Sequence, residues 1–244
     1  MVNGVQAWGV THPGIRRPTN QDCFALPGYQ STKESETCHL ELEREGAWAL
    51  VADGMGGHRA GAYASTVAVE YLAGRLHALK ASSELPDVLG EANKCIYEAM
   101  FSEGGEAGMG TTIVGLWMRG KSITVFNIGD SRAYILRHGS LTQLSVDHTP
   151  EGNSDHGYRS HRLTQSLGGT FNRIDPIPHV STLASEPGDA ILLCTDGLTD
   201  LVSYQQILSI LQKEDGNPAH NLLDAALSAG GRDNITAIFL RLSQ

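Results

Sequence analysis

Apolar positions along the chain follow two periods, and the change between them predicts where strands and helices lie. Short runs rich in β-branched and aromatic residues, bounded by glycine or asparagine turns, are typical of strands. Such runs occupy residues 5–11, 23–26, 47–52, 111–118, 122–128, 133–137, 141–144, 179–184, 190–195 and 234–242. Residues 28–46 are polar and charged instead, which predicts a surface hairpin or loop.

Helical periodicity separates these runs in two places. From residue 59 to about residue 81, apolar residues recur on one helical stripe, and Pro86 stands where a first-turn proline opens a second helix over 86–101. Two further helices are predicted over 203–213 and 218–229. Runs of strands with paired helices between them indicate an α+β protein, with antiparallel sheets covered by helices rather than alternating βαβ units.

The sequence predicts one domain over residues 1–244. It contains no proline- or serine-rich linker and no shift in composition, and we expect the first and last strands to pair in one sheet. Residues 147–162 are polar, contain histidines and lack any period, so we expect a short loop or flap within the domain.

Charge and composition argue against several classes of partner. A formal net charge of −9 is unfavourable for a nucleic-acid or anionic-membrane surface, which would need basic patches. No stretch approaches the ~20 apolar residues of a membrane span, and the N-terminal residues lack the regions of a secretory signal. The four cysteines have no CxxC spacing and are too few for a disulfide framework. We therefore expect a soluble protein of the reducing cytoplasm.

Three aspartates stand where apolar strands meet turns: Asp53 in VADGMGG, Asp196 in CTDGLTD and Asp233 in GGRDNIT. If these strands are antiparallel neighbours, the end of one lies beside the start of the next, and the carboxylates share one rim. Asp22 at the start of a strand and Asp130 in the loop GDSR extend the set. Converging carboxylates repel one another and need a cation to be stable. Each dipeptide alone is typical of an ordinary turn, so only the joint pattern favours a metal site.

The ligand chemistry of this cluster favours a hard divalent metal. Oxygen ligands without cysteine or an HExxH motif indicate Mg²⁺ or Mn²⁺ rather than structural zinc. Two such ions about 3.5–4 Å apart can share a carboxylate and a bridging water, whose lowered pKa makes hydroxide available near neutral pH. Arg16 and Arg17 precede Asp22 on the same loop, and a guanidinium there suits the non-bridging oxygens of a phosphate. A solvated or carboxylate-paired surface arginine is the alternative.

Seven segments together resemble the ordered motifs of the bacterial metal-dependent protein serine/threonine phosphatases, the type 2C or PPM family. They are GIRRPTNQD, VADGMGGHRAG, GMGTT, NIGDSRAYILR, HRLTQSLG, LLCTDGLTD and GGRDNIT, and they follow the family order across residues 8–242. The resemblance implies two stacked antiparallel β-sheets flanked by pairs of α-helices, a four-layer αββα sandwich. It also implies two Mn²⁺ or Mg²⁺ ions, or three as in bacterial members.

The resemblance assigns the metal ligands. Asp53 resembles the carboxylate that bridges both ions, and the carbonyl of Gly54 resembles a ligand of the second ion. Asp196 and Asp233 resemble the ligands that complete the first ion. Asp130 is similar to the ligand of a third, weaker ion, which it would share with Asp196.

The remaining site residues are assigned in the same way. Arg17 occupies the phosphate-binding position, and Asp22 resembles the acid that orients metal-bound water. His58 resembles the proposed general acid for the leaving oxygen, although a histidine at a helix N-terminus near the metal rim is an equal alternative. Gln21 stands where many members have glutamate. Its neutral amide can hydrogen-bond a metal-bound water but adds no charge, so we expect weaker binding of the second ion.

The predicted function is hydrolysis of phosphoserine and phosphothreonine on proteins, by in-line attack of the metal-bridging hydroxide. The phosphoprotein substrates are expected to be those of a cognate serine/threonine kinase. A phosphatase of small phosphomonoesters with the same metal centre is the main alternative, since the short flap over 147–162 would leave the site open. A non-catalytic scaffold is disfavoured because every expected ligand aspartate is present.

Overall fold

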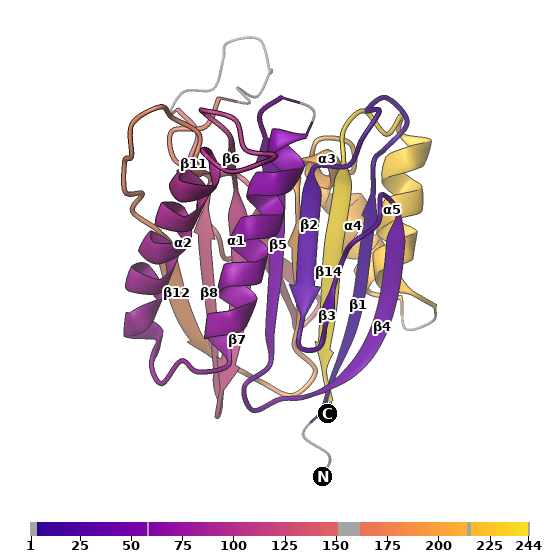
Figure 1. Ribbon diagram of the computed structural model, residues 1–244. Coiled ribbons are helices and arrows are strands. Elements are labelled where there is room, and N and C mark those ends of the chain that lie inside the picture. Colours follow the sequence, from indigo (N-terminus) through magenta and orange to yellow (C-terminus); the bar gives the residue numbers. More distant parts are fainter. Residues whose placement is uncertain (1–3, 58, 151–161, 214–215, 244) are drawn as a thin grey trace.

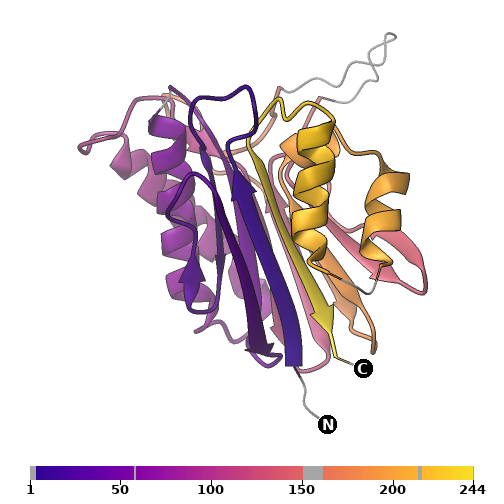
Figure 2. The same cartoon turned by 90° about the vertical axis from the view of Figure 1, so that its right-hand side faces the viewer.

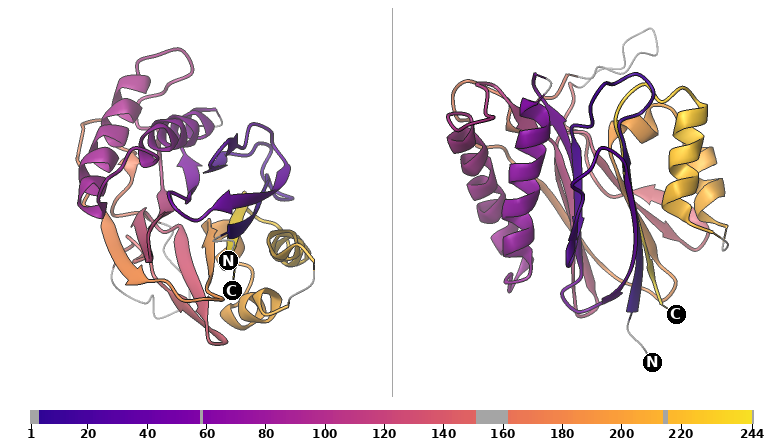
Figure 3. Two further views of the ribbon diagram at one scale, coloured as in Figure 1. Left: turned by 90° about the horizontal axis from the view of Figure 1, so that it is seen from below. Right: turned by 45° about the vertical axis from the view of Figure 1, so that its right-hand side comes forward.

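Two antiparallel β-sheets stacked face to face form the centre of the molecule, and helices cover the outer face of each sheet (Figure 1). The layers therefore run helix, sheet, sheet, helix, as the turned views show (Figure 2 and Figure 3). This arrangement confirms the α+β sandwich that the sequence predicts. The computed structural model describes residues 4–57, 59–150, 162–213 and 216–243.

The first sheet places the first and last strands of the chain side by side. Its strands are β1 (Gly4–His12), β4 (Glu36–Glu43), β9 (Arg132–Arg137), β10 (Ser140–Gln143), β13 (Ala190–Cys194) and β14 (Ile235–Leu242). Their order is β10-β9-β13-β14-β1-β4. β1 pairs with β14 from Val5 opposite Leu242 to His12 opposite Ile235, which confirms the predicted pairing of these strands.

The second sheet is built around the strand that carries Asp53. Its strands are β2 (Asp22–Leu26), β3 (Tyr29–Gln30), β5 (Trp48–Met55), β6 (Gly110–Thr111), β7 (Ile113–Arg119), β8 (Ser122–Ile128), β11 (Leu167–Gly168) and β12 (His179–Ala184). The main path is β11-β6-β5-β7-β8-β12, and β2 joins it by pairing with β5 and β3. Because β8 and β9 belong to different sheets, the loop that carries Asp130 crosses between them.

Helices cover the sheets in two groups. The helical elements are α1 (Ala60–Leu76), η1 (Ser82–Glu84) and α2 (Leu85–Ala99) over the second sheet, with α3 (Asp196–Thr199), α4 (Tyr204–Leu211) and α5 (Pro218–Ser228) over the first. α4 begins at a capping box of Ser203 and Gln206, and Asn217 caps α5 ahead of Pro218. None of the described helices combines the length and the apolarity that crossing a bilayer requires.

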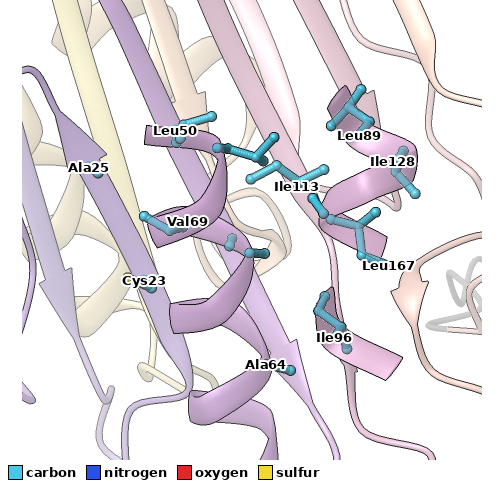
Figure 4. Packing of buried hydrophobic residues seen from close by; sticks show 14 of the residues in the cluster. Cys23, Ala25, Leu50, Ala64, Val69, Leu89, Ile96, Ile113, Ile128 and Leu167 are labelled. Carbon is cyan, nitrogen blue, oxygen red and sulfur yellow. The ribbon is translucent and has the colours of Figure 1, made fainter. Parts of the chain in front are cut away.

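Three apolar layers hold the sandwich together. Side chains alternate along each strand, so Val51 of β5 packs between the sheets whereas Leu50 packs under α1 and α2. Leu50, Val69 and Ile96 lie in the helix-covered layer (Figure 4). Leu193 of β13 is fully buried between the sheets. These layers give a rigid base to the loops at the end of the sandwich opposite the chain termini (Figure 1).

Two of the longer elements differ from the prediction, and the short elements β3, β11 and α3 were not predicted. Helix α1 ends at Leu76 rather than near residue 81, and the 3-10 turn η1 leads into α2. The polar segment 28–46 contains β4, an edge strand that pairs with β1 along its whole length. Its burial alternates residue by residue, with Leu40 and Leu42 packed on the core and charged residues outside. Apolar and polar residues alternate in this segment, which is the signal for a strand. Its charged outer face instead led to the prediction of a surface hairpin or loop.

The core between the sheets makes the first prediction. Leu193→Ala should lower the free energy of unfolding by about 2–5 kcal/mol, because it removes most of a fully buried side chain and leaves a cavity that the sheets cannot fill. Denaturant unfolding measures this change. Phe171→Ala is the control, since its side chain is 82% exposed and its loss should stay within about 0.5 kcal/mol. Equal effects of the two substitutions would contradict the packing between the sheets.

Candidate metal and phosphate site

Asp22 and Asp53 lie directly opposite one another because β2 pairs with β5 in antiparallel register. The next pair, Cys23 opposite Ala52, fixes that register inside the sheet. Like charges placed opposite each other on neighbouring strands are destabilising. The convergence of strand ends that the sequence predicts is therefore present for this pair.

The carboxylate of Asp22 links the two sheets. Its Oδ2 accepts hydrogen bonds from Thr236 Oγ1 at 2.7 Å and from Thr195 Oγ1 at 3.1 Å, both at strand ends of the first sheet. Its Oδ1 is buried and has no hydrogen-bond partner in the part of the chain that the structure describes. A buried carboxylate oxygen without a partner is costly, so this atom favours a cation or a water above it.

Burial and mutual repulsion raise the pKa of three acids at the rim. Burial is the largest cause at Asp22 and at Asp53, and the neighbouring carboxylates of Asp196 and Asp233 add to it at both. The two threonine hydrogen bonds oppose the rise in the pKa of Asp22. At Asp130, burial followed by the charge of Asp196 raises the pKa to about 6. Asp196 acts on all three, so these four acids lie within electrostatic reach of one another.

Gly54 lets helix α1 approach the strand at Asp53. The strand β5 continues through Gly54, which pairs with Thr111 of β6. A methyl group on Gly54 would lie 2.1 Å from the carbonyl oxygen of Gly61 in α1. The turn interpretation of this Asp-Gly is therefore wrong, because the glycine serves close packing of a helix on the strand.

Gly197 has the same role beside Asp196. Asp196 is the first residue of α3, directly after Thr195 at the end of β13. A methyl group on Gly197 would lie 1.9 Å from the carbonyl oxygen of Asn234. Only glycine therefore allows α3 to pack against the segment that carries Asp233.

A cavity of about 1450 Å³ lies at this rim. Seven of the residues that the sequence assigns to the site line it: Arg17, Gln21, Asp53, Gly54, Asp130, Asp196 and Asp233. Asp22 is buried and does not belong to the lining. The predicted metal ligands and the predicted phosphate-binding arginine thus share one space.

Arg17 forms a bidentate ion pair with a predicted metal ligand. Its Nε donates to Asp233 Oδ1 at 2.8 Å and its Nη2 donates to Asp233 Oδ2 at 2.6 Å. This pairing raises the pKa of Arg17. Because both oxygens of Asp233 accept from the guanidinium, a cation that binds Asp233 competes with Arg17 for the same carboxylate.

Three other arginines near the site differ in whether they line the cavity. Arg16 does not line the cavity, whereas Arg232, which the sequence analysis missed, does. Arg132 of the GDSR segment is buried, and its Nε donates to Asp147 Oδ1 and Oδ2 at 3.0 Å each. Arg132 therefore anchors the residue at which the predicted flap begins.

Asn234 is the main organising residue that the sequence analysis missed. Its Nδ2 donates to the carbonyl oxygens of Pro13 at 3.0 Å and Thr19 at 2.9 Å, and its Oδ1 accepts from the backbone N–H of Gln21 at 2.9 Å. It thereby fastens the loop that carries Arg17 to the start of β14. The amide stands next to Asp233 in the sequence, but nothing local to it shows which distant loop it binds.

Two predicted features lie outside the described residues. These are His58 and, within the predicted flap over 147–162, residues 151–161. The proposed acid role of His58 and the short flap that would leave the site open therefore stay predictions.

The donor chemistry of the rim fits divalent metal ions. All the predicted ligands offer oxygen atoms, the burial of Asp22 and Asp53 disfavours their charges, and Asp22 Oδ1 lacks a partner within the described chain. Among the described residues, no three histidine, cysteine or acidic side chains are already spaced to hold an ion. One expected ligand, Asp233, is paired with the guanidinium of Arg17 instead.

Comparisons with known proteins agree with this geometry. A family model described as Protein phosphatase 2C matches residues 34–226. The serine/threonine protein phosphatase PstP of Mycobacterium tuberculosis is 36% identical over 205 residues, which cover 77% of this chain and 39% of PstP. The serine/threonine phosphatase stp of Listeria welshimeri is 34% identical over 214 residues, which cover 78% of this chain and 82% of stp. The chain thus spans well under half the length of PstP.

Solved structures show the same fold. The catalytic domain of PstP in complex with 2 manganese ions superimposes with a TM-score of 0.78 at 29% identity, over 99% of this chain and 100% of that chain. The serine/threonine phosphatase of S. agalactiae gives a TM-score of 0.77 at 28% identity, over 97% of this chain and 98% of that chain. With the family model matched over most of its length and an aspartate-lined rim in the same sandwich, the chain belongs to the protein phosphatase 2C family.

Proposed function

We propose that this chain hydrolyses phosphoserine and phosphothreonine in proteins and depends on Mn²⁺ or Mg²⁺. The observation that carries the proposal is one cavity that holds both the aspartates of the rim and the guanidinium of Arg17. Buried carboxylates that raise one another's pKa are suited to bind cations, and the arginine is suited to bind phosphate. Relatives named as serine/threonine protein phosphatases support protein substrates over small phosphomonoesters.

The aspartates would divide the metal ions between them. Asp53, the Gly54 carbonyl, Asp196 and Asp233 would hold two ions, and Asp130 with Asp196 would hold a third. When bound, the ions supply a nucleophile near neutral pH by lowering the pKa of water, and they neutralise charge on the phosphoryl oxygens.

The chain's own groups would bind and orient the substrate. Arg17 would donate hydrogen bonds in fork geometry to the non-bridging phosphate oxygens once Asp233 is shared with a cation. Asp22 would accept a hydrogen bond from a water through Oδ1 while the threonines of the first sheet hold Oδ2. Gln21 would add an uncharged amide at the same wall of the cavity. His58 would protonate the leaving serine or threonine oxygen.

The biological setting follows from the reaction. The substrates would be proteins phosphorylated by a serine/threonine kinase, which must act before this enzyme. We also propose a cytoplasmic location, supported by the free thiols of all four cysteines.

Hydrolysis of a phosphothreonine peptide tests the proposed function. We expect turnover with Mn²⁺ or Mg²⁺ and none in excess chelator. Asp196→Asn should lower kcat by at least about 100-fold, which is more than substitution of a residue that only hydrogen-bonds to a metal ligand causes. Asp175→Asn is the control, since it also lines the cavity but lies outside the aspartate cluster. Full turnover in chelator, or an Asp196→Asn variant as active as Asp175→Asn, would contradict the metal mechanism.

Arg17→Ala should weaken the binding of substrate and strengthen the binding of metal. The KM for a phosphothreonine peptide should rise about 10-fold, as expected for the loss of charge-assisted hydrogen bonds. Mn²⁺ affinity, measured by calorimetry without substrate, should rise because Asp233 no longer pairs with the guanidinium.

The matched control for this experiment is Arg16→Ala, which removes the same charge from a residue outside the cavity. It should change neither quantity. An unchanged KM for Arg17→Ala would remove Arg17 from phosphate binding, and a fall in its Mn²⁺ affinity would rule out the competition.

A further inference from the structure

An apolar loop stands beside the aspartate cavity and has no role in the reaction described above. It joins β11 to β12, and it carries three of the largest apolar side chains that the described chain leaves exposed. Phe171 is 82% exposed, Ile174 is 64% exposed and Ile177 is 77% exposed. Exposed apolar side chains gathered next to a functional cavity are typical of binding surfaces.

The backbone of this loop is fixed although its apolar side chains are not packed. The fully buried Asn93 of α2 donates from Nδ2 to the carbonyl oxygen of Ile174 at 3.0 Å. Tyr97 of the same helix donates to the carbonyl oxygen of Asn172 at 3.0 Å, and the backbone N–H of Ile177 donates to Gln165 Oε1 at 2.6 Å. Polar anchors therefore hold the loop, so its isoleucines are presented without a cost in loop ordering when a ligand binds.

Two of the three apolar side chains face the reaction site. Ile174 and Ile177 line the same cavity as Asp53 and Asp196, whereas Phe171 does not line it. A substrate with its phosphate at the aspartates would bring the residues next to its phosphorylated residue into the same cavity, which the two isoleucines line.

We propose that Ile174 and Ile177 form a subsite for an apolar side chain of the phosphoprotein substrate, close in sequence to the phosphorylated residue. The proposal rests on the protein phosphatase function proposed above. An acidic neighbour in the substrate fits less well, because Asp175 lines the cavity next to Ile174. An apolar side chain instead removes isoleucine surface from water on binding.

The test compares phosphothreonine peptides in which a single leucine is moved through the positions on either side of the phosphothreonine, with an all-serine peptide as reference. For the wild-type chain with Mn²⁺, one leucine position should raise kcat/KM about 10-fold over the reference, the low end of what one apolar group contributes in a hydrophobic pocket. In the double variant Ile174→Ser, Ile177→Ser this preference should disappear. Hydrolysis of p-nitrophenyl phosphate, which has no peptide chain, should stay unchanged.

Phe171→Ser is the matched control, because it removes an exposed apolar side chain from the same loop outside the cavity. It should keep the leucine preference. Loss of the preference in Phe171→Ser alone, retention of it in the double variant, or no leucine preference in the wild type would each overturn the subsite. If the wild-type chain hydrolyses p-nitrophenyl phosphate but none of the phosphopeptides, the protein phosphatase function fails and the subsite fails with it.

Discussion

The rim of the sandwich depends on one constraint: the sheets hold carboxylates together where burial and mutual repulsion both disfavour their charges. Asp22 and Asp53 face each other in register, and burial of both raises their pKa values. Neither can move away, because the pairing that opposes them continues into the apolar core. The fold therefore prevents the two carboxylates from moving apart, and a bound cation offsets their negative charge.

Several contacts around the rim hold these carboxylates in place or neutralise them. Thr195 and Thr236 hold one oxygen of Asp22 from the opposite sheet, and Asn234 ties the arginine loop to the strand that follows Asp233. Arg17 neutralises Asp233 directly. The same guanidinium is the group proposed to bind phosphate, so cation binding and phosphate binding are connected through one carboxylate.

The sequence was sufficient for most of the strands, the helix pairs and the aspartates that meet at the rim. Those features follow from local periodicity and from where strands end, and the structure brings Asp53, Asp130, Asp196 and Asp233 to one cavity. The strand β4 was missed because its outer face is charged. The roles of the Asp-Gly glycines were misread because their cause is packing against segments far away in the chain.

The hydrogen-bond and ion-pair partners at the site could not be predicted either, because they too lie far away in the chain. An amide such as that of Asn234, or a guanidinium such as that of Arg17, has many partners of equal chemistry in a sequence. Only the three-dimensional arrangement decides between them. The pairing of Arg17 with Asp233 joins residues 216 positions apart, and no local pattern distinguishes that carboxylate from the others at the rim.

The thermal stability of Asp53→Asn tests the central claim most directly. If buried charge repulsion strains the rim, removing one charge should raise Tm in excess chelator by at least about 2 °C, the scale of roughly 1 kcal/mol in a domain of this size. The same variant should lose most of the rise in Tm that Mn²⁺ gives the wild-type chain. Glu103→Gln, which removes an equal charge from an exposed position, should change neither value. A lower Tm for Asp53→Asn in chelator would contradict the account.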